Sequence, residues 1–140
     1  MTKTGEHRFF NMCRKVAMKN ISAKKLYNFG AVLVKGGSII STGINKAKSD
    51  PLIQFMAEQH KGFPQQVHCE VDCLSGVQRH NIRGCVLYIA RIKLTDNSFA
   101  IARPCNMCEA FLKQHKIKRV YYSITGEPNS PILEYGVLKL

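Results

Sequence analysis

The chain has 140 residues, 45% of them hydrophobic, and 21 Lys and Arg against 9 Asp and Glu give it a formal net charge of +12. This length suits one domain over residues 1–140, the apolar content excludes a disordered chain, and no apolar run is as long as a secretory signal or a membrane span. The charge favours an anionic partner, either nucleic acid or a phosphorylated small molecule.

The N-terminal third predicts an amphipathic helix followed by a β-hairpin. In residues 6–19, apolar side chains recur at helical spacing between lysines and arginines. Residues 29–34 and 38–41 are β-rich runs on either side of Gly36-Gly37. Two such runs around a glycine pair are typical of a hairpin.

The central part of the chain combines an irregular connection with a predicted helix. Residues 45–67 are the least regular stretch, and within them 52–60 has the pattern of a short helix. Connections this long inside a domain are usually functional. Residues 68–80 then predict a helix with Val71, Leu74 and Val77 on its apolar stripe.

Strands and helices alternate in the second half. The order predicts a strand at 86–90, a turn at 95–98, a strand at 99–102, a helix beginning at Pro104 and a strand at 119–124. The segment after Ile124 is too short for a helical crossover, so residues 132–138 are expected to return as an antiparallel strand. We therefore predict the α/β class, a mixed sheet covered by helices.

Two short motifs, each at the start of a predicted helix, carry the candidate chemistry. The first is His68-Cys69-Glu70 and the second is Pro104-Cys105-Asn106-Met107-Cys108. Two thiolates at i and i+3 lie on one helix face and can share an ion, and the helix dipole favours the thiolate form. With His68 as third ligand, a zinc ion keeps its fourth position for water, which is the mark of a catalytic site.

Glu70 is the candidate general acid and base. Zinc lowers the pKa of its bound water towards ~7. Deamination also requires protonation of the ring nitrogen and of the leaving amine, and a single carboxylate beside the metal can serve both steps. The pattern H-x-E followed by P-C-x-x-C is a known signature of zinc deaminases of nucleobases.

With these motifs the chain resembles the cytidine and deoxycytidylate deaminase superfamily, over roughly residues 6–124. Residues 30–34 and Gly43-Ile44-Asn45 fit the same resemblance. It implies a three-layer fold with a central sheet of about five strands and the two motif helices packed beneath it. It also implies that Asn45 hydrogen-bonds a sugar hydroxyl, that Phe29 lines the pocket and that the backbone amide of Cys69 meets the base.

A structural zinc site is the main alternative. Cys69 and Cys73 are four residues apart, so they could form a four-thiolate site with Cys105 and Cys108 in a nucleic-acid-binding module. Further expectations concern single residues. Met107, Cys13 and Cys85 are expected to be packing residues, Asp72 a surface residue pointing away from Glu70, and His7, His80 and His115 solvated.

A free pyrimidine nucleotide is the expected substrate, and a base within a polynucleotide is the alternative. A free nucleotide such as deoxycytidine monophosphate is favoured by the small size, whereas cytosine or adenine in single-stranded DNA, RNA or tRNA is favoured by the charge and by the basic run at 113–119. Arg103 is a candidate phosphate clamp. Since no export segment is seen, a cytoplasmic location with six reduced cysteines is expected. No membrane partner is expected, and the resemblance implies a homo-oligomer.

Overall fold

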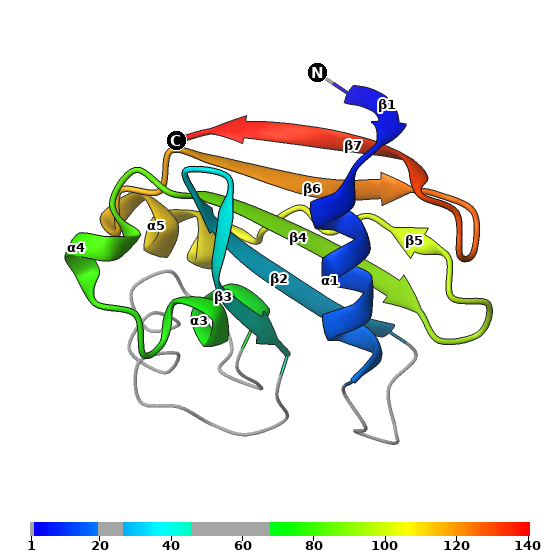
Figure 1. Cartoon of the computed structure of the whole chain (residues 1–140), viewed down its shortest axis with the longest axis horizontal. Helices are drawn as coiled ribbons and strands as arrows, with labels where there is room; N and C mark the ends of the chain where they lie inside the picture. The colour runs from blue at the N-terminus through cyan, green and yellow to red at the C-terminus, as the bar shows by residue number, and fades with distance from the viewer. Residues whose placement is uncertain (1, 20–26, 46–67) are drawn as a thin grey trace.

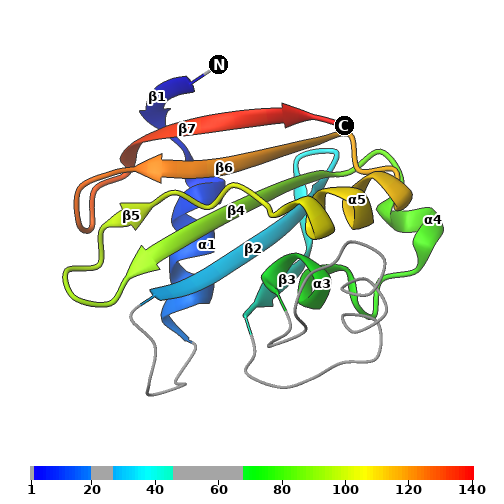
Figure 2. The ribbon, with the colours of Figure 1, turned by 180° about the vertical axis from the view of Figure 1, so that it is seen from behind.

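A computed structural model describes residues 2–19, 27–45 and 68–140, and the predicted helix at 52–60 lies outside these residues. The described strands form one mixed sheet with the order β1-β7-β6-β4-β2-β3, and β5 pairs with β4 beside this path. The strands are β1 (Thr2–Glu6), β2 (Tyr27–Lys35), β3 (Ser38–Ile44), β4 (Val86–Lys93), β5 (Phe99–Ala100), β6 (Arg119–Thr125) and β7 (Ile132–Lys139). The helices are α1 (Arg8–Met18), α3 (Cys69–Leu74), α4 (Arg79–Ile82) and α5 (Asn106–Gln114) (Figures 1 and 2).

The α/β class is confirmed, but the described sheet has seven strands rather than about five. β1 was not predicted, and β5 is shorter than the strand predicted at 99–102. Among the described strands β1 pairs with β7 alone, at the edge of the sheet, and its sequence shows no alternation of apolar and polar residues. β5 is two residues long and pairs with β4 through Phe99 and Ala100.

The predicted hairpin is confirmed by the antiparallel pairing of β2 with β3. Its two turn glycines, Gly36 and Gly37, have φ angles of 57° and 81°. A two-residue hairpin loop with positive φ at both positions matches the right-handed twist of the strands, and glycine adopts it without steric cost.

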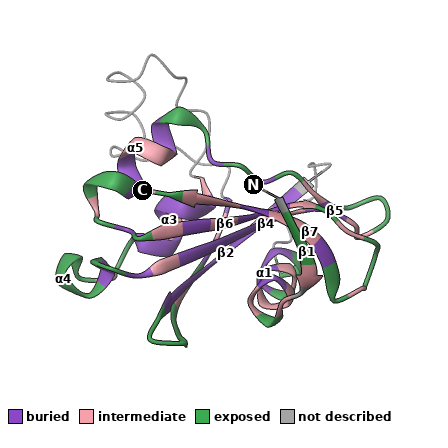
Figure 3. Ribbon diagram, turned by 90° about the horizontal axis from the view of Figure 1, so that it is seen from above, coloured by how far each residue is buried: buried purple, intermediate pink, exposed green. Residues whose placement is uncertain are grey.

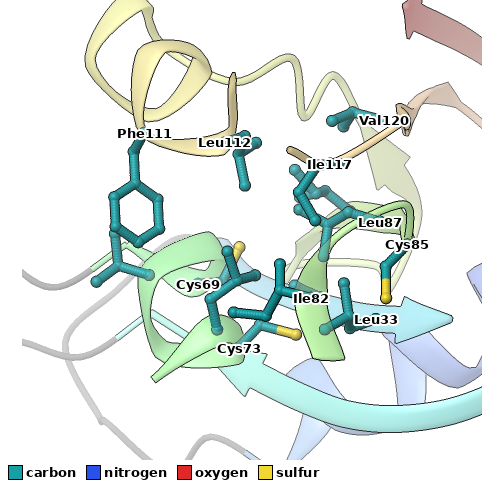
Figure 4. Close-up of a cluster of buried hydrophobic side chains, with 14 of the residues drawn as sticks. Leu33, Cys69, Cys73, Ile82, Cys85, Leu87, Phe111, Leu112, Ile117 and Val120 are labelled. Carbon is teal, nitrogen blue, oxygen red and sulfur yellow. The ribbon is translucent and has the colours of Figure 1, made fainter. Parts of the chain in front are cut away.

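The helices cover both faces of the sheet, as the three-layer prediction requires (Figure 3). α1 buries Phe10, Cys13, Val16 and Ala17 against one face, so the prediction that Cys13 is a core residue is confirmed. α3 and α5 pack on the opposite face around a second cluster, which includes Cys85 and the side chains in Figure 4. Both motif helices therefore lie on one side of the sheet.

The helix predicted at 68–80 is shorter than expected. α3 ends at Leu74, and Gly76 follows with a φ of 86°. This left-handed conformation, which glycine adopts readily, ends the helix. Val71 and Leu74 are buried as predicted, and Val77 contacts the same core from beyond the helix end.

The C-terminal part of the sheet agrees with the sequence-based expectation. β4 and β6 are parallel, and α5 lies in the connection between them. β7 returns antiparallel to β6, which confirms the strand predicted at 132–138. None of the described helices has the length and hydropathy needed to cross a bilayer.

Candidate metal centre and pocket

The first motif lies at the start of α3. His68 is the N-cap residue, and its carbonyl oxygen accepts the backbone N–H of Asp72 at 3.1 Å. The helix approaches β3 very closely at Gly43, where any Cβ atom would collide with the backbone of Cys69 and Cys73. Glycine at this position therefore lets β3 and the first turn of α3 meet backbone to backbone, and this sets where His68 enters the site.

The second motif lies at the start of α5. Cys105 is the N-cap residue, and its carbonyl oxygen accepts the N–H of Glu109 at 2.9 Å. The Cys105 side chain is exposed, whereas Cys108, one helical turn later, is buried. Met107 is buried in the core, as predicted for a packing residue.

The two helix starts bring three donor atoms together. Nδ1 of His68 lies 3.1 Å from Sγ of Cys108 and 3.8 Å from Sγ of Cys105, although His68 and Cys105 are 37 residues apart in the sequence. The three donor atoms all lie within 4.8 Å of one another. Tetrahedral zinc with ordinary bond lengths places a nitrogen and a sulfur ligand about 3.6 Å apart. One nitrogen and two sulfurs at these separations therefore fit a zinc ion.

The protonation of the two thiols is strongly coupled. A hydrogen bond from Cys108, assisted by His68, lowers the pKa of Cys105 to about 4. The pKa of Cys108 is raised by its hydrogen bond to Cys105 and by burial. The hydrogen bond to Cys105 also raises the pKa of His68. Two sulfurs this close cannot both be thiolates without a compensating positive charge, which a divalent cation would supply.

Glu70 is buried beside these donors, with only 5% of its surface exposed. Its Oε1 accepts a hydrogen bond from Sγ of Cys69 at 2.9 Å. Glu70 also contributes to the raised pKa of Cys108 through its charge and a hydrogen bond. A buried carboxylate is thus held beside the thiols of Cys69 and Cys108.

The four-thiolate alternative does not form among the described residues. The group of possible ligand residues is His68, Cys105 and Cys108, and it includes neither Cys69 nor Cys73. The Cys69 thiol hydrogen-bonds Glu70 instead. Cys73 is fully buried, and burial raises its pKa to about 12, which disfavours the thiolate form that zinc requires.

A cavity of about 250 Å³ opens beside the donor atoms. Asn45 is 5% exposed there, and its Oδ1 accepts the backbone N–H of Phe29 at 3.0 Å. The guanidinium group of Arg91 lies 5.5 Å from the centre of the Phe29 ring. Seven of the eight residues predicted for the site line this cavity, and Cys108 does not. The lining of the cavity consists of Phe29, Asn45, His68, Cys69, Glu70, Ala102, Arg103, Pro104 and Cys105.

Arg103 lies at the exposed side of this lining. Its guanidinium group donates to the hydroxyl of Tyr122 at 3.4 Å and lies 5.9 Å from the centre of the Tyr122 ring. Because Tyr122 is buried, it holds the guanidinium group of Arg103 in place, although Arg103 itself is exposed to solvent.

Asp72 is a residue whose role the sequence-based reasoning missed. The prediction of a surface residue was wrong, because Asp72 is half-buried and its Oδ2 accepts the backbone N–H of Ile44 at 2.9 Å. This bond joins α3 to the end of β3, directly before Asn45. No local signal could have shown it, since the partner lies 28 residues away in the sequence.

Two of the three histidines predicted to be solvated are packed instead. His7 is surrounded by aromatic rings, among them Tyr88 at 4.8 Å and Phe10 at 5.4 Å between centroids. His115 lies 4.3 Å from the Phe111 ring, and its Nδ1–H donates to the Phe111 carbonyl oxygen at 2.9 Å. His80 is exposed as predicted.

Comparisons with known proteins agree with this geometry. The family model of the cytidine and deoxycytidylate deaminase zinc-binding region matches residues 3–124. No functionally curated protein shows significant sequence similarity to the chain. Among solved structures, an apo dCMP deaminase from the cyanophage S-TIM5 is 22% identical with a TM-score of 0.51, and the match covers 81% of this chain and 77% of that one.

A second similar structure is RibD from Acinetobacter baumannii. It is 18% identical with a TM-score of 0.50, and the match covers 81% of this chain but 26% of RibD. The chain therefore spans about a quarter of that protein. At these identities the two structures show a shared fold.

Proposed function

The chain belongs to the cytidine and deoxycytidylate deaminase family, and from that premise we propose that it removes the exocyclic amine of cytosine in a free pyrimidine nucleotide such as deoxycytidine monophosphate. The chain is a zinc-dependent hydrolytic deaminase, as its family and its His/Cys/Cys group indicate. The observation that carries the proposal is the convergence of His68, Cys105 and Cys108 beside the buried carboxylate of Glu70.

His68, Cys105 and Cys108 are the proposed zinc ligands. When bound, the zinc ion supplies a Lewis acid that makes a water molecule nucleophilic near neutral pH. The protein fixes the geometry, since both sulfurs lie on one turn of α5 and Nδ1 of His68 approaches from the start of α3. Three protein ligands leave room for one solvent or substrate atom.

Glu70 is the proposed proton carrier. Hydrolysis adds water to the ring carbon that bears the amine, so that cytosine and water give uracil and ammonia. Glu70 takes one proton from the attacking water and gives it to the adjacent ring nitrogen. It then takes the second proton from the hydroxyl group now on the ring carbon and gives it to the amine, which leaves as ammonia. Its burial keeps bulk water from competing for these protons.

The cavity suits a single nucleobase. Its volume of about 250 Å³ lies below the ~300–1,000 Å³ of pockets for drug-sized ligands. Phe29, Cys69 and Asn45 line the cavity. In the proposal Phe29 supplies an apolar wall, the backbone amide of Cys69 binds the base and Asn45 binds a sugar hydroxyl. Only the base then has to enter the cavity, while the sugar and phosphate remain at its mouth.

Arg103 is the proposed phosphate ligand. Its guanidinium group lies at the exposed side of the cavity and rests on Tyr122. Guanidinium groups bind phosphates with two parallel hydrogen bonds. This residue favours a 5′-monophosphate over an uncharged nucleoside. Such a substrate, together with ligand thiols that must stay reduced, also favours a cytoplasmic location.

A mass-spectrometric substrate panel tests the proposal. The zinc-loaded protein is offered cytidine, deoxycytidine, their mono- and triphosphates, adenosine, guanine and short oligonucleotides. The expected result is replacement of the amine by oxygen in deoxycytidine monophosphate, with Glu70→Gln as an inactive control that still binds zinc. Conversion of oligonucleotides without conversion of any mononucleotide would refute the proposed substrate.

A further inference from the structure

Positively charged residues are concentrated at one end of the molecule. Figures 1 and 2 show α4 and the end of α5 at one end, and β5 with the β6–β7 turn at the other. At the first end, two neighbouring hollows are lined by Arg79, His80, Arg83, Lys113, His115, Lys116 and Lys118, with no Asp or Glu side chain among their lining residues. We call these residues the basic surface.

The opposite end carries both signs of charge. A hollow beside β5 and the β6–β7 turn is lined by Asp96, Glu127 and Glu134, and the guanidinium group of Arg14 donates to the carbonyl oxygens of Glu127 and Ser130 there. A basic surface that serves only solubility would be mixed with acidic groups in the same way. The two hollows of the basic surface have no Asp or Glu in their lining, and such a concentration of cations attracts an anionic partner.

The basic surface is held rigidly by the backbone. The Arg79 guanidinium donates to the carbonyl oxygen of Gln114 at 2.9 Å, and the N–H of Gly84 donates to the carbonyl oxygen of Lys116 at 2.8 Å. The N–H of Lys118 donates to the carbonyl oxygen of Cys85 at 2.8 Å. The two segments that carry the cations are thus joined by three hydrogen bonds, so their charges keep a fixed spacing.

The shape and chemistry of this surface favour a chain of phosphates. The hollows have volumes of about 490 and 530 Å³ and share Arg83 and Lys116, so an anion in each would lie close to the other. The lining includes no Phe, Tyr or Trp; its large aliphatic residues are Ile117, which is 2% exposed, and the half-buried Leu140. Protein partners usually depend on aromatic or large aliphatic anchors, whereas non-specific binding of nucleic acids depends mainly on phosphate contacts.

We infer that the basic surface binds the phosphodiester backbone of single-stranded nucleic acid. The basic surface is distinct from the cavity proposed to hold the base. Helix α5 begins at the cavity and ends at the basic surface, and its nine residues span about 13 Å. The inference therefore concerns a second binding function, independent of which nucleotide the cavity accepts. We infer a single strand because the described elements at this surface are the four-residue helix α4 and the end of α5, and neither presents a long ridge that could enter a duplex groove.

Fluorescence anisotropy with a labelled oligothymidylate tests the inference. Thymine has no exocyclic amine, so a deaminase cannot convert it and the readout is independent of catalysis. The test variant is Arg83→Gln/Lys113→Gln/Lys118→Gln. The matched control is Lys3→Gln/Lys15→Gln/Lys93→Gln, which removes the same number of exposed cations from elsewhere.

The test variant is expected to weaken binding by at least about tenfold near physiological salt, and to reduce the slope of log affinity against log salt by ~2. The control is expected to change affinity less than about twofold. Equal losses in both variants, or no binding by the unmodified protein at low salt, would overturn the inference. If the triple variant does not fold, as judged by circular dichroism, Lys118→Gln alone should still reduce the slope by ~0.7.

Competition experiments identify the ligand. Unlabelled oligothymidylate should displace the probe, whereas thymidine monophosphate at equal phosphate concentration should not. Displacement by the monophosphate would assign the surface to single nucleotides and overturn the inference. Equal displacement by polyglutamate at matched charge would assign it to acidic protein segments, and duplex DNA competing better than the single strand would contradict the single-stranded form.

Discussion

The carboxylate of Asp72 accepts a hydrogen bond from the backbone N–H of Ile44 at 2.9 Å and thereby joins the helix that carries Glu70 to the last residue of β3, directly before Asn45. Asn45 in turn accepts the N–H of Phe29 at 3.0 Å. Asp72 therefore has no place in the cavity lining, yet it fixes the wall that the substrate is proposed to meet. We regard it as a positioning residue.

Asp72→Ala should raise KM for the nucleotide substrate about tenfold while changing kcat less than about threefold. The physical reason is that the Ile44 N–H loses its acceptor, which costs about 1–3 kcal/mol when the group is buried. Zinc content should stay unchanged. Asp72→Asn keeps an acceptor oxygen and should recover most of the loss. Steady-state kinetics and metal analysis decide the matter, and a loss of zinc would argue against a positioning role.

Replacing any proposed ligand should remove zinc. His68→Ala, Cys105→Ala and Cys108→Ala are each expected to lower zinc content to a small fraction of that of the unmodified protein, because two protein ligands hold zinc much more weakly than three. Cys73→Ala, a cysteine outside the donor group, is the matched control and should keep its zinc. Metal analysis after dialysis gives the answer, and the reverse pattern would restore the four-thiolate interpretation.

Gly43→Ala should destabilise the protein and reduce activity. The added Cβ would collide with the backbone of Cys69 and Cys73, so α3 must move away from β3 at a cost of about 1–3 kcal/mol. Gly5→Ala is the control, since a Cβ at Gly5 would meet no atom within 4 Å. Thermal unfolding should show a lower Tm for the first variant and nearly no change for the second. An unchanged Tm in Gly43→Ala would mean that the close approach is not needed.

Arg103→Gln should raise KM for deoxycytidine monophosphate about tenfold and leave that for deoxycytidine unchanged. A charge-assisted hydrogen bond to phosphate contributes about 1.5–3 kcal/mol, and only the phosphorylated substrate can lose it. Kinetics with the two substrates on the same protein preparation provide an internal control. Equal changes for both substrates would show that Arg103 acts on the shape of the cavity rather than on the phosphate.

His7 should make stability depend on pH. Burial among aromatic rings, followed by the charge of Arg8, lowers its pKa below the ordinary 6.5. The unfolded chain therefore binds a proton more readily than the folded one, so stability falls as the pH drops through 6.5 and levels off below the folded-state pKa. The Tm of the unmodified protein should thus fall more between pH 7.5 and 5.5 than that of His7→Asn. The difference between the two proteins removes the contribution of the other titrating groups to the pH dependence of Tm. Identical pH profiles would contradict the lowered pKa of His7.

The sequence predicted those features that depend on local pattern. The periodicity of residues 8–18, the glycine pair of the hairpin and the spacing of Cys105 and Cys108 each led to an element or arrangement that the structure contains. Features decided by distant partners were missed or misjudged. β1 exists because Thr2 to Glu6 pair with β7 at the other end of the chain, and Asp72 and His7 acquire their surroundings only through tertiary packing.

The donor atoms of the metal centre come from two segments, the starts of α3 and α5, that are far apart in the sequence. An ion bound there would cross-link the starts of α3 and α5. Its binding energy would then add to the free energy of folding. Zinc supply would accordingly govern how long the polypeptide survives in a cell, because copies made during scarcity would open more often and be degraded sooner.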